Sequence, residues 1–187
     1  PHHDGSGWIE AVGDGVPRTR IGELVWLFEA GRDSRAWGTA AELTVVSAAQ
    51  AVRMPSGGDP LLGACLGVPA MTAHACVLGD GPVDGATILI AGAAGGVGRA
   101  AVQLARWAGA RVLATAGSPA QMEIAREAGA DLLWSYKDPD LAAKILSAVP
   151  DGVDRIVEVA LASNVETDVR IARPRAPIVS FASGADG

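Results

Sequence analysis

The residues in this chain with the clearest chemical potential are three glycines in the segment AGAAGGVGRAAVQLA, residues 91–105. Gly92, Gly95 and Gly98 recur at every third position, and Ala93 stands where the usual dinucleotide fingerprint has its first glycine. An apolar run precedes them and an amphipathic run follows, which predicts a strand, a tight turn and a helix start. Backbone N–H groups at such a helix start can hold a pyrophosphate that a Cβ atom would keep away. The pattern indicates dinucleotide binding, with a tight structural turn that binds no ligand as the alternative.

The end of the next predicted strand bears on which dinucleotide would bind. NAD-binding domains place an acidic residue there for the ribose 2′-hydroxyl, but residues 111–118 contain no acid. Hydroxyl groups and cations favour a 2′-phosphate instead. This makes Thr115, Ser118, Tyr136 and Lys137 candidate contacts and predicts NADPH as the cofactor. Ser118 is also a candidate helix N-cap, and the two roles are compatible.

Strands and helices alternate from residue 87 onward, which is the arrangement needed to position these residues. Buried strands with turn signals between them and helices of this length predict an α/β fold with a doubly wound parallel Rossmann sheet and right-handed crossovers. The expected strands are 87–92, 111–116, 132–136, 155–160 and 176–182. The expected helices are 96–107, 118–129 and one that opens at Asp138 and Pro139.

The first third of the chain follows a different pattern. Short strand-like runs at 7–12, 22–30 and 38–46 are separated by glycine-rich turns, which predicts an antiparallel β module. Residues 61–78 form a helix-length apolar stretch, and we expect a break at Val68 and Pro69. This stretch is the predicted seam between two domains.

Composition narrows the class of protein. The 187 residues are 49 % hydrophobic, enough for a sizeable core, and the formal net charge of -6 disfavours nucleic-acid binding as a main role. The two cysteines, Cys65 and Cys76, are too few for a disulfide scaffold and favour a reducing cytoplasm. The longest apolar stretch is rich in glycine and contains Arg99, so we expect no membrane span.

The combination of motifs resembles a known family. The glycine turn, LGVPAMTAHA at 66–75, GTAAELTVV at 38–46, ATAGSPAQMEIA at 114–125 and IVEVALASN at 156–164 are similar to the quinone oxidoreductase branch of the medium-chain dehydrogenase/reductase superfamily, and within it to zeta-crystallin-like NADPH:quinone reductases. The resemblance implies part of a GroES-like antiparallel β domain over residues 1–66 and a Rossmann NADPH-binding domain over 67–187. It also implies a chain truncated at both ends, without the last Rossmann strand and the C-terminal return segment.

The resemblance also carries site residues over to this chain. Thr72 matches a cofactor contact near the nicotinamide, and Gly95, Gly96 and Val97 match the pyrophosphate turn. Ser118 and Tyr136 match contacts to the 2′-phosphate, and Phe181 matches a residue that lines the nicotinamide pocket. No catalytic side chain is assigned. The segment RPRAPIV at 173–179 stands where relatives have a Gly-Gly turn, so we expect an altered loop before the fifth strand.

The activity implied by the resemblance is NADPH-dependent reduction of small-molecule quinones or activated alkenes, by a protein that is a homo-oligomer when full length. A polyketide-type enoyl reductase, a non-catalytic NADPH- or RNA-binding protein and an inactive fragment are the alternatives. We expect no metal site. Val68 stands where the zinc enzymes of the superfamily need a cysteine, Cys65 is three residues too early, and His2 and His3 are read as solvated terminal residues.

Overall fold

The computed structural model describes residues 2–32 and 37–183. The chain divides into two compact units, residues 1–71 and 72–187. None of the described helices is long and apolar enough to span a membrane.

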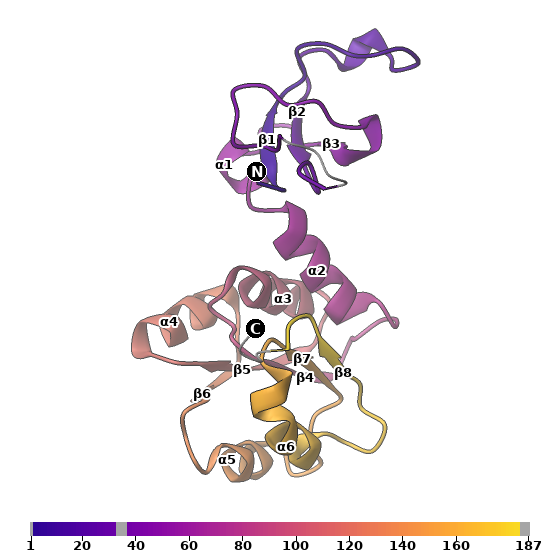
Figure 1. Cartoon of the computed structure of the whole chain (residues 1–187). Helices are drawn as coiled ribbons and strands as arrows, with labels where there is room; N and C mark the ends of the chain where they lie inside the picture. The colour runs from indigo at the N-terminus through magenta and orange to yellow at the C-terminus, as the bar shows by residue number, and fades with distance from the viewer. Residues whose placement is uncertain (1, 33–36, 184–187) are drawn as a thin grey trace. The chain divides into compact units, whose positions relative to one another are not determined.

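The second unit is built on a parallel sheet of five strands (Figure 1). Its order is β6-β5-β4-β7-β8 and every neighbouring pair is parallel, which confirms the predicted doubly wound sheet. The strand order reverses between β4 and β7, and ligands of such sheets bind beyond the carboxyl ends of the strands at this point. The strands are β4 (Thr87–Ile90), β5 (Arg111–Ala116), β6 (Leu132–Ser135), β7 (Arg155–Glu158) and β8 (Ile178–Ser180).

Helices cover both faces of this sheet (Figure 1). Alternate residues of β4 and β5 point to opposite faces: Ile88 and Val112 pack with α3 and α4, whereas Leu89 and Leu113 pack with α5 and α6. These strands are apolar on both faces because both faces are buried. The helices are α2 (Gly67–Leu78), α3 (Gly96–Trp107), α4 (Pro119–Ala128), α5 (Leu141–Ala148) and α6 (Leu161–Ile171).

The first unit contains an antiparallel sheet in the order β1-β2-β3. Its strands are β1 (Gly5–Trp8), β2 (Leu24–Leu27) and β3 (Ala51–Arg53), and it also holds the short helix α1 (Pro60–Gly63). The predicted strand at 38–46 is wrong: the third strand is Ala51–Arg53, and both edges of β2 are already paired. Leu43 and Val45 are 67 % and 87 % exposed, so this apolar run does not bury the surface that would hold it as a strand.

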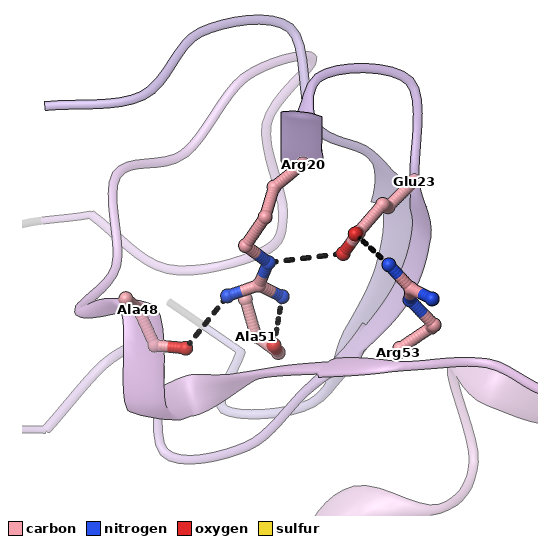
Figure 2. A network of polar contacts seen from close by, with 5 residues as sticks. All are labelled: Arg20, Glu23, Ala48, Ala51 and Arg53. Carbon is pink, nitrogen blue, oxygen red and sulfur yellow. Dashed lines mark hydrogen bonds and ion pairs between the residues drawn. The ribbon is translucent and has the colours of Figure 1, made fainter. Parts of the chain in front are cut away.

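A network of hydrogen bonds and ion pairs connects the segments around the antiparallel sheet (Figure 2). The guanidinium of Arg20 donates to the carboxylate of Glu23 at 2.9 Å and to the carbonyl oxygens of Ala48 and Ala51 at 3.2 and 2.7 Å. Arg53, at the end of β3, donates to the other oxygen of Glu23. One carboxylate thus joins the turn before β2 to β3.

The helical break is not where we predicted it. Residues 64–66 form the turn between α1 and α2, and α2 runs without interruption through Val68 and Pro69. Pro69 lies in the first turn of α2, where its missing N–H would have no partner in any case, so it does not break the helix. The helix predicted at Asp138 begins at Leu141 instead, because the Asp138 side chain accepts the N–H of Asp140 in a turn.

Candidate functional site

The glycine turn follows β4 at the point where the strand order reverses. Gly92 has φ +64°, in the left-handed region that glycine enters at little cost. The N–H of Ala93 donates to the carbonyl of Thr115 on β5 at 3.0 Å, and the N–H of Gly95 donates to the carbonyl of Gly92 at 3.0 Å. The neighbouring strand and the turn itself therefore fix the backbone that leads into α3.

The glycines of the motif differ in what an added Cβ atom would meet at each position. A Cβ atom on Gly98 would lie 2.9 Å from the Cα of Ala93, so this position is closed by the approach of α3 to the turn. A Cβ atom on Gly95 would meet only the Gly92 carbonyl oxygen at 3.4 Å, an ordinary van der Waals contact. Packing does not require a glycine at residue 95, and the space beside it is open.

This open space adjoins backbone donors. Gly95 is the N-cap of α3 with φ −73° and ψ 166°, and no side chain caps the helix. The N–H groups of Gly96 and Val97 have no acceptor within the described part of the chain. Unpaired N–H groups and the positive end of the helix dipole suit an anion. The turn therefore has the geometry of a phosphate-binding loop.

A second group of predicted residues gathers at the ends of β5 and β6. Ser118 is the N-cap of α4, and its Oγ accepts the N–H of Gln121 at 3.3 Å. The ring of Tyr136 packs against Gly117: a Cβ atom there would lie 2.7 Å from the ring carbon Cζ. The Lys137 ammonium lies 5.9 Å from the centre of the same ring. A hydroxyl, a phenol and a cation thus lie next to one another, and Tyr136 is 49 % exposed.

Thr115 differs from these neighbours. It is 4 % exposed, and its carbonyl accepts the Ala93 N–H. The contact that the structure gives this residue is therefore structural: it ties β5 to the glycine turn.

Thr72 and Phe181 occupy separate places in the second unit. Thr72 is half-buried on α2. Phe181 directly follows β8, packs partly against the core and donates its N–H to the carbonyl of Glu158 at 3.1 Å. Because β7 neighbours β4, this contact puts Phe181 at the same edge of the sheet as the glycine turn.

Two buried acids at this edge were missed by the sequence reasoning. Glu158 ends β7 and Asp168 lies on α6, and each is 1 % exposed. Burial and the neighbouring carboxylate of Glu158 raise the pKa of Asp168 to about 7. The available signal was an acid at the end of an otherwise apolar predicted strand.

In the first unit, His2, His3 and Asp4 line a hollow of about 480 Å³ together with Val68. Asp4 Oδ1 accepts the N–H of Val68 at 2.8 Å, so this carboxylate is engaged at the start of α2. No group of three His, Cys, Asp or Glu side chains in the described ranges is placed to hold a metal ion.

Comparison with known proteins shows which enzymes the chain is similar to. Residues 96–187 match the family model described as zinc-binding dehydrogenase. The quinone oxidoreductase of Rattus norvegicus is 34 % identical over 91 % of this chain and 51 % of its own length. The chain thus spans about half the length of the curated quinone oxidoreductases it matches.

Solved structures agree in fold. An NAD-dependent alcohol dehydrogenase matches 99 % of this chain and 60 % of its own with 28 % identity and a TM-score of 0.87. The CurK enoyl reductase matches 95 % of this chain and 52 % of its own with 27 % identity and a TM-score of 0.82. The parallel sheet of this chain matches a Rossmann domain, and its separate antiparallel sheet matches a GroES-like domain. The solved relatives share this combination of folds. The family model and the curated relatives support the predicted resemblance to the quinone oxidoreductase branch of the medium-chain dehydrogenase/reductase superfamily.

Proposed function

We propose that this protein is an NADPH-dependent, zinc-independent oxidoreductase that reduces quinones or activated alkenes. The observation that carries the proposal is the open glycine turn: Gly95 has room beside it that packing does not need, next to N–H groups of Gly96 and Val97 that have no acceptor among the residues the structure describes. A ligand with a pyrophosphate explains both features.

The residues fit a dinucleotide with a 2′-phosphate. Gly95, Gly96 and Val97 would hold the pyrophosphate. Ser118 uses an oxygen lone pair to cap α4, which leaves its O–H free to donate to a phosphate oxygen.

Tyr136 and Lys137 would complete the phosphate end of the site, with Thr115 behind them. Thr72 and Phe181 are the proposed contacts at the nicotinamide end. A bound nicotinamide would supply the hydride, and the protein would bind it, orient it and exclude water.

The domain assignment belongs to the same proposal. Residues 1–66 would be part of a GroES-like domain and residues 67–187 a Rossmann NADPH-binding domain. Zinc independence is supported by Val68 in the hollow with His2 and His3, where a ligand side chain would be needed. The net charge of -6 supports a small-molecule partner over a nucleic acid. A cytoplasmic location and a homo-oligomer in the full-length protein complete the proposal.

A polyketide-type enoyl reductase is the second candidate, favoured by the likeness to the CurK enoyl reductase. The two activities use the same cofactor turn and differ in the acceptor. Turnover of enoyl thioesters in preference to quinones would select this alternative.

The deciding experiment has two steps. NADPH and NADH are titrated by quenching of tryptophan fluorescence, and loss of NADPH absorbance is then followed with a quinone, an enone and an enoyl thioester. The proposal expects tighter binding of NADPH, fastest turnover with the quinone or the enone, and less than one equivalent of zinc by elemental analysis. Equal or tighter binding of NADH, or one tightly held zinc per chain, would contradict it.

A further inference from the structure

Two orphaned oxygen atoms lie at the carboxyl end of β7. Glu158 Oε2 and Asp168 Oδ2 are both buried and have no hydrogen-bond partner among the residues that the structure describes. A buried carboxyl oxygen without a partner is unfavourable, because it has lost its hydrogen bonds to water. The two side chains interact directly, and one shared proton would satisfy both oxygens at once.

The surroundings decide which group carries that proton. Glu158 Oε1 accepts the N–H groups of Val159 and Ala160 at 2.7 and 2.5 Å, and the side-chain amide of Asn164 at 3.1 Å. Three donors thus engage Glu158 Oε1 as an acceptor, which leaves Oε2 to accept the shared proton. Asp168 is therefore the acid, in keeping with a pKa raised to about 7 by burial and by the charge of Glu158.

Other charged groups on the elements packed around the pair are engaged elsewhere or face solvent. Arg155 on β7 donates to a carbonyl and a carboxylate near the end of α2. Lys144 on α5 pairs with a carboxylate in the turn before that helix, and Glu166 and Arg170 on α6 are exposed. Strand β8 contains no ionisable residue. Among the described residues, Glu158 is the one charged group that shifts the pKa of Asp168.

The pair supports the backbone at the edge of the sheet. Through Oε1, Glu158 fixes the connection from β7 to α6, and through its carbonyl it accepts the N–H of Phe181. Val159 of this connection lies against the glycine turn, since a Cβ atom on Gly92 would be 3.0 Å from its Cγ1. A displacement of Glu158 would therefore move Val159, which lies against the turn, and Phe181, which lies at the same edge of the sheet.

We propose that Glu158 and Asp168 share one proton and act as a positioning pair for the cofactor edge. With the proton in place, the pair holds Val159 beside the glycine turn and Phe181 beside β7. When the proton leaves, two buried carboxylates repel each other and both segments loosen. The consequence for cofactor binding rests on the function proposed above, but the shared proton does not.

The matched variants are Asp168→Asn and Glu166→Gln. The amide of Asp168→Asn can donate to Glu158 Oε2 at every pH, so it keeps the contact without a titratable proton. Glu166→Gln removes a carboxylate from an exposed position of the same helix and is the control for charge.

The first readout needs no cofactor. Hydrogen exchange of the Val159, Ala160 and Phe181 amides is measured from pH 5.5 to 8.5 and divided by the intrinsic rate at each pH. We expect protection to fall through about pH 7 in the wild type and in Glu166→Gln, and to stay constant in Asp168→Asn. The same pH dependence in wild type and Asp168→Asn would overturn the proposal. If Asp168→Asn does not fold, carbon NMR of the wild-type Asp168 carboxyl decides, and a midpoint near 4 overturns it.

The second readout is NADPH affinity over the same range. We expect the ratio of Kd in the wild type to Kd in Asp168→Asn to rise above pH 7, by up to about tenfold per pH unit. The ratio cancels the titration of the cofactor's own phosphate. If no variant binds NADPH, the proposed function fails while hydrogen exchange still decides the pair. If NADPH binds and the ratio stays flat, the positioning role fails and the proposed function stands.

Discussion

The ring of Tyr136 occupies the space that a side chain on Gly117 would need: a Cβ atom there would lie 2.7 and 2.8 Å from the ring carbons Cζ and Cε1. Residue 117 follows directly after β5, in the region where NAD-binding domains carry their acid. The phenol of Tyr136 thus lies in the region where NAD-binding domains have an acidic side chain, and Gly117 leaves room for the ring.

The first prediction concerns this contact. Gly117→Ala forces the Tyr136 ring outward, and we expect NADPH affinity to fall by about three- to tenfold, the equivalent of one ordinary hydrogen bond. Tyr136→Phe keeps the ring in place and removes only the hydroxyl. Binding titrations with NADPH and NADH check the result. If Gly117→Ala leaves NADPH affinity unchanged, the position of the ring does not matter for binding.

Ser118 allows a test that separates its two roles. Aspartate is as good an N-cap as serine, so Ser118→Asp should keep α4 intact while placing a negative charge beside the proposed 2′-phosphate. Losing a charge-assisted hydrogen bond of about 1.5–3 kcal/mol lowers NADPH affinity by roughly ten- to a hundredfold, and NADH should bind as before. Equal losses for both cofactors would reassign Ser118 to capping alone.

The loop before β8 contains a residue in a costly conformation. Arg175 has φ +71°, in the left-handed region where an L side chain costs about 1–2 kcal/mol. Glycine relieves this strain but adds freedom to the unfolded chain, so Arg175→Gly should raise the free energy of unfolding by up to about 1 kcal/mol. Arg175→Ala, which keeps a Cβ atom, is the control and should give no gain in thermal or denaturant unfolding. An equal gain from alanine would trace the effect to charge.

The sequence predicted the second unit better than the first, for a physical reason. Strands β4 and β5 are apolar on both faces, and α4 is flanked by its N-cap Ser118 and its C-cap Gly129, which has φ +112°, so local signals and burial agree. In residues 38–46 the apolar pattern has no buried face to match it. Strand β3 is only three residues long, too short for a recognisable apolar pattern. It is held by pairing with β2, in which Val52 lies opposite Trp26.

The site was predictable only in part. The glycine turn and the Ser118 cap are local patterns, so spacing alone revealed them. The packing of Tyr136 on Gly117 depends on β5 and β6 being neighbours. The pairing of Glu158 with Asp168 depends on how α6 returns over β7, and a pattern of single residues does not contain that information.

Acid should weaken the small sheet of the first unit. Hydrogen bonds from Arg53 and Arg20 lower the pKa of Glu23 in the folded state. The unfolded chain therefore takes up the proton first as pH falls, and this stabilisation is present above the ordinary glutamate pKa and is lost below it. We expect amide exchange in β2 to accelerate between pH 5 and 3, beyond the intrinsic trend, and Glu23→Gln to remove most of that change. Glu10→Gln, at an exposed position of the same unit, should behave like the wild type.

The last prediction contrasts two glycines of the same turn. At Gly95 a side chain would enter open space beside the unpaired N–H groups, and Gly95→Val should abolish binding of NADPH and NADH together. The fold should lose no more than about 1 kcal/mol, since no side-chain cap is removed.

At Gly98 a side chain would meet the backbone of Gly92 and Ala93, so Gly98→Val should cost at least about 1–3 kcal/mol of stability through overpacking. Thermal unfolding and cofactor titration of the two variants side by side separate the roles. A Gly95→Val protein that unfolds as readily as Gly98→Val would make residue 95 a packing position. A stable Gly95→Val protein that still binds either cofactor would remove the pyrophosphate from this turn, because no other feature of the turn accounts for the open space at residue 95 and the unpaired N–H groups that adjoin it.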